Sequence, residues 1–377
     1  MIRFSTGSHA GRLAAILSVA TEYPYYSLNL LGSDKHYRRS VKKLTAINEI
    51  HNSESGEKLT SQILTVSGKG SAKTIRLYKG ALPILRWISP DALPSYLTAS
   101  KNHKFSGNIK NIDRNHRVAE AVAMCMRMGM EYRPHMLPSL QNERILPVIP
   151  SEPVFYPSKI LKSIGQVEMN KTMFTRMVGC VFSGNKCFAV YNTRNAVMKW
   201  NGMGEFKALH NLIEIARMNA GLTSIDSAIL FGQSDKVLLD TLMANEKNKR
   251  LEFRFDRIYN HIHFVPLSIA GVRLLKLICL PEVQQRLLNL LFESDSLSNG
   301  SGLFEYDAYV DKKYILSHLD GDVARLIRFK EALLLNRFDS EVVCYDFQAD
   351  YVNAFLAGLA KVKIIEMSLV ETELELC

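Results

Sequence analysis

The stretch SDKHYRRSVKKLTAINEI, residues 33–50, decides how this chain is organised. Ser33 follows Gly32 and suits the N-cap of a helix. Apolar side chains recur in it at helical spacing, so they share one side and can face a core: Tyr37, Val41 and Leu44. Cations recur on another side: Lys35, Arg38, Arg39, Lys42 and Lys43. Such a helix can bind a rod-shaped polyanion, and the DNA major groove admits a helix of this width.

A solvated outer face is the alternative interpretation of a cationic helix, so its surroundings matter. Helical spacing predicts helices over 9–22 and 25–31 before it. A polar loop over 51–58 follows it, and then 63–66 and 74–78 alternate apolar and polar residues around a turn rich in Gly and Ser. Two helices, a basic helix and a hairpin in this order predict a winged helix-turn-helix.

The turn of this hairpin would form the tip of the wing. Lys69, Lys73 and Arg76 would then hold the DNA backbone or reach a minor groove beside the basic helix. A plain surface turn is the alternative interpretation. The sequence G-K-G-S in this turn lacks the spacing of a nucleotide-binding phosphate loop.

The net charge of +10 is concentrated in the first third of the chain. Residues 1–118 contain 18 Lys and Arg against 7 Asp and Glu, a balance of +11, whereas the remainder contains 29 against 30. This asymmetry predicts a polyanion-binding part, with double-stranded DNA as its partner, attached to a neutral part. Structured RNA is a further candidate.

Bulk composition favours a soluble globular protein, with 47% hydrophobic residues and a mean hydropathy of −0.03. No apolar run is long enough to span a bilayer, so we expect a cytoplasmic protein with no membrane partner. The six cysteines form no C-x-x-C pair, which argues against a disulfide framework and a zinc module.

The segment DRNHRVAE, residues 113–120, opens a further predicted helix, in which we expect His116 to be a structural polar residue. With the basic helix and wing before it, residues 10–125 resemble the replication-relaxation proteins, winged-helix proteins of bacterial plasmids and integrative elements. FSGNIKNIDRNHRVAEAV and MNKTMFTRMVG also resemble stretches of uncharacterised proteins from such mobile genetic elements. The resemblance implies DNA binding in replication, plasmid relaxation, conjugative transfer or transcription control, with an α/β domain after the DNA-binding unit.

Three parts are expected along the chain. They are a winged helix-turn-helix over 1–80, a helical and proline-rich connector over 81–150, and an α/β domain over 151–377. Within the connector, residues 81–110 are expected to be irregular. In the last part, strands are predicted over 176–182, 187–191, 227–232, 261–265, 341–347 and 362–367, with helices between them, including 205–219 and 323–335. This alternation predicts a mixed sheet covered by helices, with a degenerate restriction-nuclease-like fold as one possibility.

Catalysis has one candidate, the E-x-K sequence formed by Glu205 and Lys207, which resembles the Mg²⁺ site of restriction-type nucleases. It opens a predicted helix rather than lying on a strand, and amides precede it where an acid is needed. A Mg²⁺-dependent nuclease is therefore the alternative. Our leading interpretation has no catalytic residue, metal or cofactor, and a neutral domain that binds a protein partner or forms a homodimer.

Two further patterns were weighed as metal sites. His261 and His263 would point to one face of a strand, but a packed or capping role is favoured for them. The sequence Asp320-Gly321-Asp322 is predicted to be a turn and the N-cap of the next helix.

Overall fold

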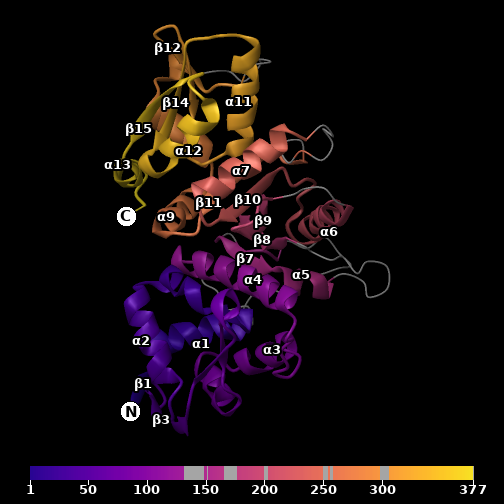
Figure 1. Cartoon of the computed structure of the whole chain (residues 1–377), viewed down its shortest axis with the longest axis vertical. Helices are drawn as coiled ribbons and strands as arrows, with labels where there is room; N and C mark the ends of the chain where they lie inside the picture. The colour runs from indigo at the N-terminus through magenta and orange to yellow at the C-terminus, as the bar shows by residue number, and fades with distance from the viewer. Residues whose placement is uncertain are drawn as a thin grey trace.

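The computed structural model describes residues 1–130, 148–150, 152–164, 176–198, 203–248, 254, 258–297 and 305–376. The fold is mixed α/β, as expected, but the described part of 151–377 contains two sheets rather than the single mixed sheet predicted. It is elongated, with the N-terminal lobe at one end and the C-terminal four-stranded sheet at the other (Figure 1). Within the described ranges, no helix combines the length and the apolar character needed to cross a bilayer.

The N-terminal lobe contains two small sheets, β1-β3-β4 and β2-β6-β5. Its elements up to the end of the second sheet are β1 (Ile2–Phe4), α1 (His9–Ala20), β2 (Tyr23–Pro24), the 3-10 helix η1 (Tyr25–Leu31), α2 (Asp34–Leu44), β3 (Asn48–Asn52), β4 (Lys58–Ser61), β5 (Leu64–Ser67), η2 (Gly70–Ala72) and β6 (Thr74–Leu77). The predicted helices and the predicted hairpin are thereby confirmed as elements.

The basic helix ends earlier than the quoted stretch. α2 stops at Leu44, and residues 48–52 form strand β3. Ile50 lies opposite Ile2 of β1 and is fully buried, which holds this segment extended. The polar loop expected over 51–58 is therefore wrong in part, because its two ends belong to the β3–β4 hairpin.

The irregular structure predicted over 81–110 is wrong for most of residues 81–99, which are helical, and is found at 88–91 and 100–108. The 3-10 helix η3 (Lys79–Trp87) and helix α3 (Ala92–Ala99) bury apolar side chains in the core of the lobe, and the Trp87 ring packs edge-on against Phe4 at 5.4 Å between centroids. Prolines had suggested a connector here. Pro83 is accommodated inside η3, where the 3-10 geometry tolerates it.

Helix α4 (Ile109–Arg127) joins the two halves of the molecule. One side packs on α1, η1 and β2, and the other on the central sheet and α9 (Ile269–Ile278). Figure 1 shows α4 crossing between the lower lobe and that sheet. Residues 131–147 of the expected connector, including Pro134, Pro138 and Pro147, lie outside the described residues.

The central sheet has the order β11-β10-β9-β8-β7, with β9, β10 and β11 parallel. Its strands are β7 (Val154–Pro157), β8 (Met177–Ser183), β9 (Lys186–Arg194), β10 (Ser227–Gly232) and β11 (His261–Pro266). Its two faces contribute to two separate core clusters. Helices α4 and α9 cover one face of this sheet. Helix α5 (Ser158–Ile164) contacts β7 and β8, α6 (Met203–Ala220) contacts β9, and α7 (Asp235–Glu246) contacts β10.

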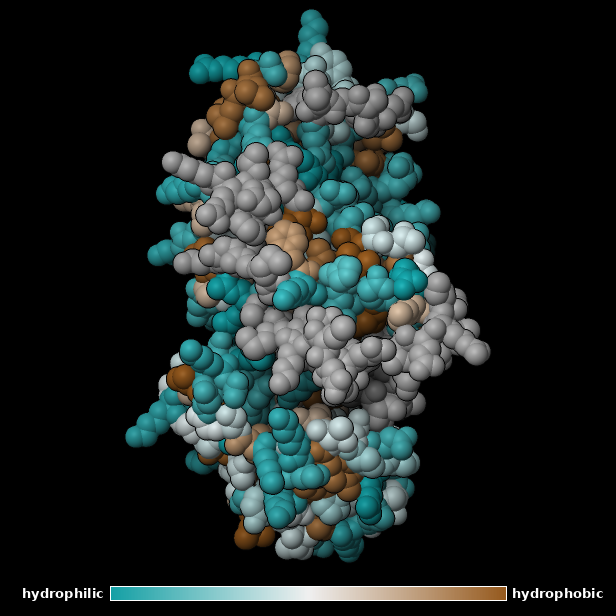
Figure 2. Space-filling view, turned by 90° about the vertical axis from the view of Figure 1, so that its right-hand side faces the viewer, coloured by the Kyte–Doolittle hydropathy of each residue, from teal (hydrophilic) through white to brown (hydrophobic). Residues whose placement is uncertain are grey.

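The C-terminal sheet has the order β12-β13-β14-β15. It comprises β12 (Ala308–Val310), β13 (Lys313–Ser317), β14 (Ser340–Tyr345) and β15 (Lys361–Ile365), with α11 (Val323–Leu335), α12 (Asp346–Leu356) and α13 (Met367–Glu373). Helix α10 (Val283–Leu291) and η6 (Ser294–Ser296) precede it. On the side shown in Figure 2, hydrophilic side chains predominate and apolar ones gather in small groups.

Candidate nucleic-acid interface

A groove of about 660 Å³ runs between α2 and the β5–β6 hairpin. Its lining includes no acidic side chain and four cations: Arg38, Arg39, Lys42 and Lys73. Polar and apolar side chains complete it: Tyr25, Val41, Thr45, Gln62, Leu64, Thr65 and Val66. The basic helix and the hairpin, predicted separately from the sequence, therefore share one positively charged concavity.

The two sides of α2 explain its orientation. Tyr37, Val41 and Leu44 are each 3% exposed or less and pack in the core of the lobe. Ser33 lies at the N-cap position, although its side chain makes no capping hydrogen bond, and Asp34 places negative charge in the first turn. Burial of the apolar side fixes the cationic side toward solvent, as the periodicity predicted.

Tyr25 ties the basic helix to the hairpin. The guanidinium of Arg38 lies 5.0 Å from the Tyr25 ring centroid, and the ammonium of Lys73 lies 3.9 Å from it. The Tyr25 backbone N–H also donates to the Lys73 carbonyl at 2.9 Å. Each cation–π contact contributes on the order of 0.5–1 kcal/mol at an exposed site. The ring therefore holds two cations from different elements at the same rim.

Arg38 is further positioned by Asp34. Its Nε donates to the Asp34 carboxylate at 2.6 Å, one helical turn away, and this hydrogen bond raises the pKa of Arg38. Both side chains remain about 40% exposed. The guanidinium thus stays charged and reachable from solvent.

Arg76 departs from its predicted role. Its side chain is 18% exposed and forms an ion pair with the buried Glu22, with Nε 2.6 Å from Oε1. The Phe105 ring lies on the other side of the guanidinium at 4.5 Å. Asn115 also donates to Glu22. Arg76 is therefore absent from the groove and neutralises a carboxylate inside the lobe.

The remaining predicted contact residues are exposed but lie outside the groove lining: Lys35, Lys43 and Lys69. Lys43 borders a smaller hollow on the other side of α2, next to His9 and Ser8. Lys69 lies at the tip of the hairpin, just before η2. The structure thus gathers half of the eight predicted cations around one groove.

Sequence reasoning missed Tyr25, Gln62 and Thr65 as groove residues. Tyr25 had been assigned only as the start of a short helix. Gln62 and Thr65 are ordinary polar residues at the start of the hairpin, and nothing in their local pattern sets them apart. Their position follows only from the packing of β5 beside α2.

Glu205 and Lys207 do not form a site. Glu205 is 6% exposed at the start of α6, whereas Lys207 is exposed and borders a separate hollow with His210 and Glu214. Residues two apart on a helix project in different directions, unlike the same-face arrangement of a strand. The nuclease-type arrangement that the E-x-K sequence suggested is absent from this pair.

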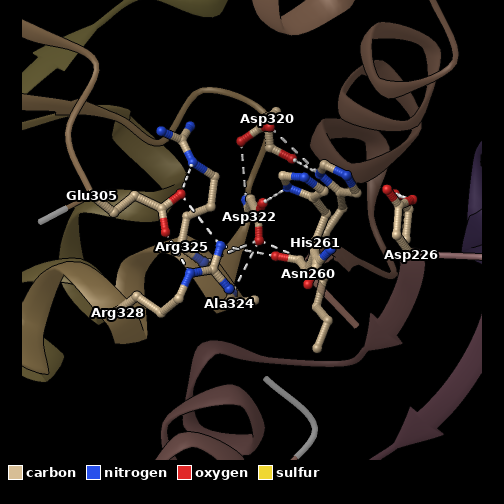
Figure 3. A network of polar contacts seen from close by, with 12 residues as sticks. Asp226, Asn260, His261, Glu305, Asp320, Asp322, Ala324, Arg325 and Arg328 are labelled. Atoms are coloured by element: carbon tan, nitrogen blue, oxygen red, sulfur yellow. Dashed lines mark hydrogen bonds and ion pairs between the residues drawn. The ribbon is translucent and has the colours of Figure 1, made fainter. Parts of the chain in front are cut away.

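The two histidines of β11 take part in a polar network, of which Figure 3 labels His261, Asp320 and Asp322. His261 Nδ1 lies 2.7 Å from Asp322, and His263 Nδ1 lies 3.0 Å from the Asp320 carbonyl. Asp322 also accepts from the backbone N–H groups of Ala324 and Arg325, so its predicted N-cap role is confirmed. The hydrogen bond to Asp322 raises the pKa of His261.

His116 and five of the six cysteines are buried. His116 is 1% exposed, its Nε2 lies 2.9 Å from the Thr74 hydroxyl, and burial lowers its pKa to about 4. Five cysteines are free and buried, and Cys377 lies outside the described residues. Among the side chains that the structure places, no group of three or more His, Cys, Asp or Glu could hold a metal.

No protein-family model, curated protein or solved structure matches this chain. The groove must therefore be interpreted from its own geometry and charge.

Proposed function

We propose that the protein binds double-stranded DNA through a winged helix-turn-helix in its N-terminal lobe. The observation that carries the proposal is the groove between α2 and the β5–β6 hairpin, with four cations and no acidic residue in its lining. In this proposal α2 enters the major groove, and the hairpin acts as the wing beside it. Phosphate contacts set affinity and register, and groups such as Gln62 and Thr65 lie near enough to assist.

Strand and helix order support this assignment. The segments α1, β2, η1, α2, β5 and β6 follow one another, and β6 pairs with both β2 and β5. A three-stranded sheet of this kind fixes the hairpin beside a basic third helix. The β3–β4 hairpin is an insertion between α2 and the wing.

The likeness of residues 10–125 to replication-relaxation proteins gives the proposal its setting. DNA binding would serve replication, relaxation, transfer or transcription control of a plasmid or integrative element. The C-terminal domain would then contact a protein partner or a second copy of the chain. Strand β15 ends its sheet and exposes Ile364 at 56%, which supports this second part.

The test compares two double variants in a fluorescence-anisotropy titration with labelled duplex DNA. Arg38→Ala/Arg39→Ala removes two groove cations, and Lys361→Ala/Lys363→Ala removes two exposed cations of β15 as a charge-matched control. We expect the groove variant to bind at least about tenfold more weakly at moderate salt, and the control to bind within about twofold. Equal affinity of both double variants would refute the groove as the DNA-binding surface.

A further inference from the structure

A second basic cavity lies where α1, the loop between α3 and α4, α4 and α5 meet. It has a volume of about 270 Å³ and is lined by four cations: Lys101, Lys104, Arg114 and Lys159. The remaining lining consists of hydroxyls, amides and a few apolar side chains, and includes no carboxylate. This composition suits an anion, since four cations and no carboxylate line one concave space.

Three of these cations, Lys101, Lys104 and Arg114, have no ion-pair partner among the residues that the structure describes. Lys159 is partly buried, and its ammonium reaches the Thr21 hydroxyl at 3.3 Å. Burial lowers the pKa of Lys159, and repulsion from Lys101 lowers it further, whereas attraction to Glu22 raises it. Glu22 is already paired with Arg76, so a bound anion would relieve this concentration of positive charge.

The loop that supplies two of the lysines is held in an unusual conformation. Lys101, Asn102 and His103 have positive φ angles of 51°, 58° and 62°. Consecutive non-glycine residues in the left-handed region are costly and persist where surrounding contacts impose them. Here His103 lies 2.7 Å from the Tyr96 hydroxyl and packs edge-on against Phe105 at 5.0 Å. The loop is thus fixed with Lys101 and Lys104 at the cavity.

We propose that this cavity binds a small phosphate ester, of the size of a mononucleotide. A phosphomonoester carries nearly two negative charges at neutral pH and three acceptor oxygens, which match converging lysines and an arginine fork. The volume lies just below the usual range of small-molecule pockets, so it suits a phosphate with a small organic part.

The position of the cavity separates it from the proposed DNA groove. In Figure 1, α2 lies at the left of the lower lobe, whereas α3 and α5 lie at the right. None of the residues that line one cavity lines the other. A duplex lying along α2 would therefore leave this cavity open to a second ligand.

Isothermal titration calorimetry with AMP, inorganic phosphate and adenosine tests the proposal on the full chain. We expect AMP to bind, inorganic phosphate to compete with it, and adenosine not to bind. Arg114→Ala and Lys104→Ala should each weaken AMP binding at least about tenfold. Lys110 is an exposed cation on α4, the helix of Arg114, but lies outside the cavity, so Lys110→Ala should leave AMP binding unchanged. Thermal melting confirms that each variant is folded.

Saturating duplex DNA and the Arg38→Ala/Arg39→Ala variant separate this proposal from DNA binding. AMP affinity should survive both, even though the variant loses DNA. Displacement of AMP by the duplex would contradict the proposal by making the cavity part of the DNA surface. Absence of AMP binding at millimolar concentration, or equal binding to Arg114→Ala, would also overturn it while leaving the DNA proposal intact.

Discussion

Arg76, predicted from the sequence as a DNA contact, lies inside the N-terminal lobe instead. Its guanidinium pairs with Glu22, which is only 1% exposed. Removing one partner of a buried pair leaves the other charge uncompensated, which costs about 3–5 kcal/mol. Lys73, by contrast, contacts Tyr25 at the groove and has no ion-pair partner in the described chain.

We therefore predict that substituting Arg76 lowers stability and spares DNA affinity, whereas substituting Lys73 lowers DNA affinity and spares stability. Arg76→Met should lower the free energy of unfolding by about 3 kcal/mol while leaving the DNA affinity of the folded fraction nearly unchanged. Lys73→Met should change stability by less than about 1 kcal/mol and weaken DNA binding. Urea unfolding and anisotropy titrations on both variants provide the measurement. A marked loss of DNA affinity with unchanged stability for Arg76→Met would contradict the assignment.

His116 predicts a pH dependence of stability. Burial lowers its pKa to about 4 in the folded protein, against an ordinary value near 6.5, so the unfolded chain binds the proton first as pH falls. Acidification from about pH 6.5 to 4 should therefore cost about 2–3 kcal/mol through this residue. His116→Gln should remove that part of the slope, measured by urea unfolding at several pH values. An unchanged slope would show that His116 binds its proton equally readily in the folded and the unfolded chain, which would contradict the lowered pKa.

At the scale of elements, the β5–β6 hairpin, which we propose as the wing, depends on its turn. Gly68 has φ 81°, and a Cβ there would lie 2.4 Å from the Ala72 carbonyl oxygen. Gly70, in the same turn, has φ 54° but open space around it. The two glycines therefore share a left-handed backbone conformation and differ in the room available for a side chain.

Gly70→Ala should cost about 1 kcal/mol, the ordinary penalty of a left-handed residue with a side chain. Gly68→Ala should cost more and should also weaken DNA binding, because the turn must move and carry Lys69 and Lys73 with it. Urea midpoints and DNA affinities of the two variants check this difference. Equal urea midpoints and equal DNA affinities for the two variants would mean that the turn accommodates the Gly68→Ala side chain without displacing the lysines.

Helices and hairpins were predictable where one local period fixed them. The spacing of Tyr37, Val41 and Leu44 defined the buried side of α2, and strand β10 was predicted with its observed bounds, 227–232. The β3 strand was missed because its pairing with β1 joins residues about 50 positions apart. A local pattern carries no signal for such a partner.

Site residues followed the same division. The cations of α2 could be predicted from their spacing. The burial of Arg76, by contrast, depends on its ion pair with Glu22, which is 54 residues away in the chain. Likewise, the acids beside His261 and His263 come from a loop about 60 residues later. Long-range pairing, rather than residue type, decided which charged groups reached solvent.

At the scale of the whole molecule, α4 makes the two halves one continuous structure. Glu120 accepts from Ser27 of the N-terminal lobe at 2.7 Å and from Asn192 of the central sheet at 2.9 Å. Arg194 of β9 contacts Asp113 of α4 and the Tyr26 ring. These contacts join the N-terminal lobe to the carboxyl end of β9 through α4.

The salt dependence of DNA binding tests the central claim most directly. Log affinity should fall linearly with log salt at about −0.9 per phosphate contacted, and the Arg38→Ala/Arg39→Ala variant should reduce that slope by about 1.8. The Lys361→Ala/Lys363→Ala variant should retain the full slope. A parent protein whose duplex affinity is independent of salt, or a groove variant with the parental slope, would contradict the account.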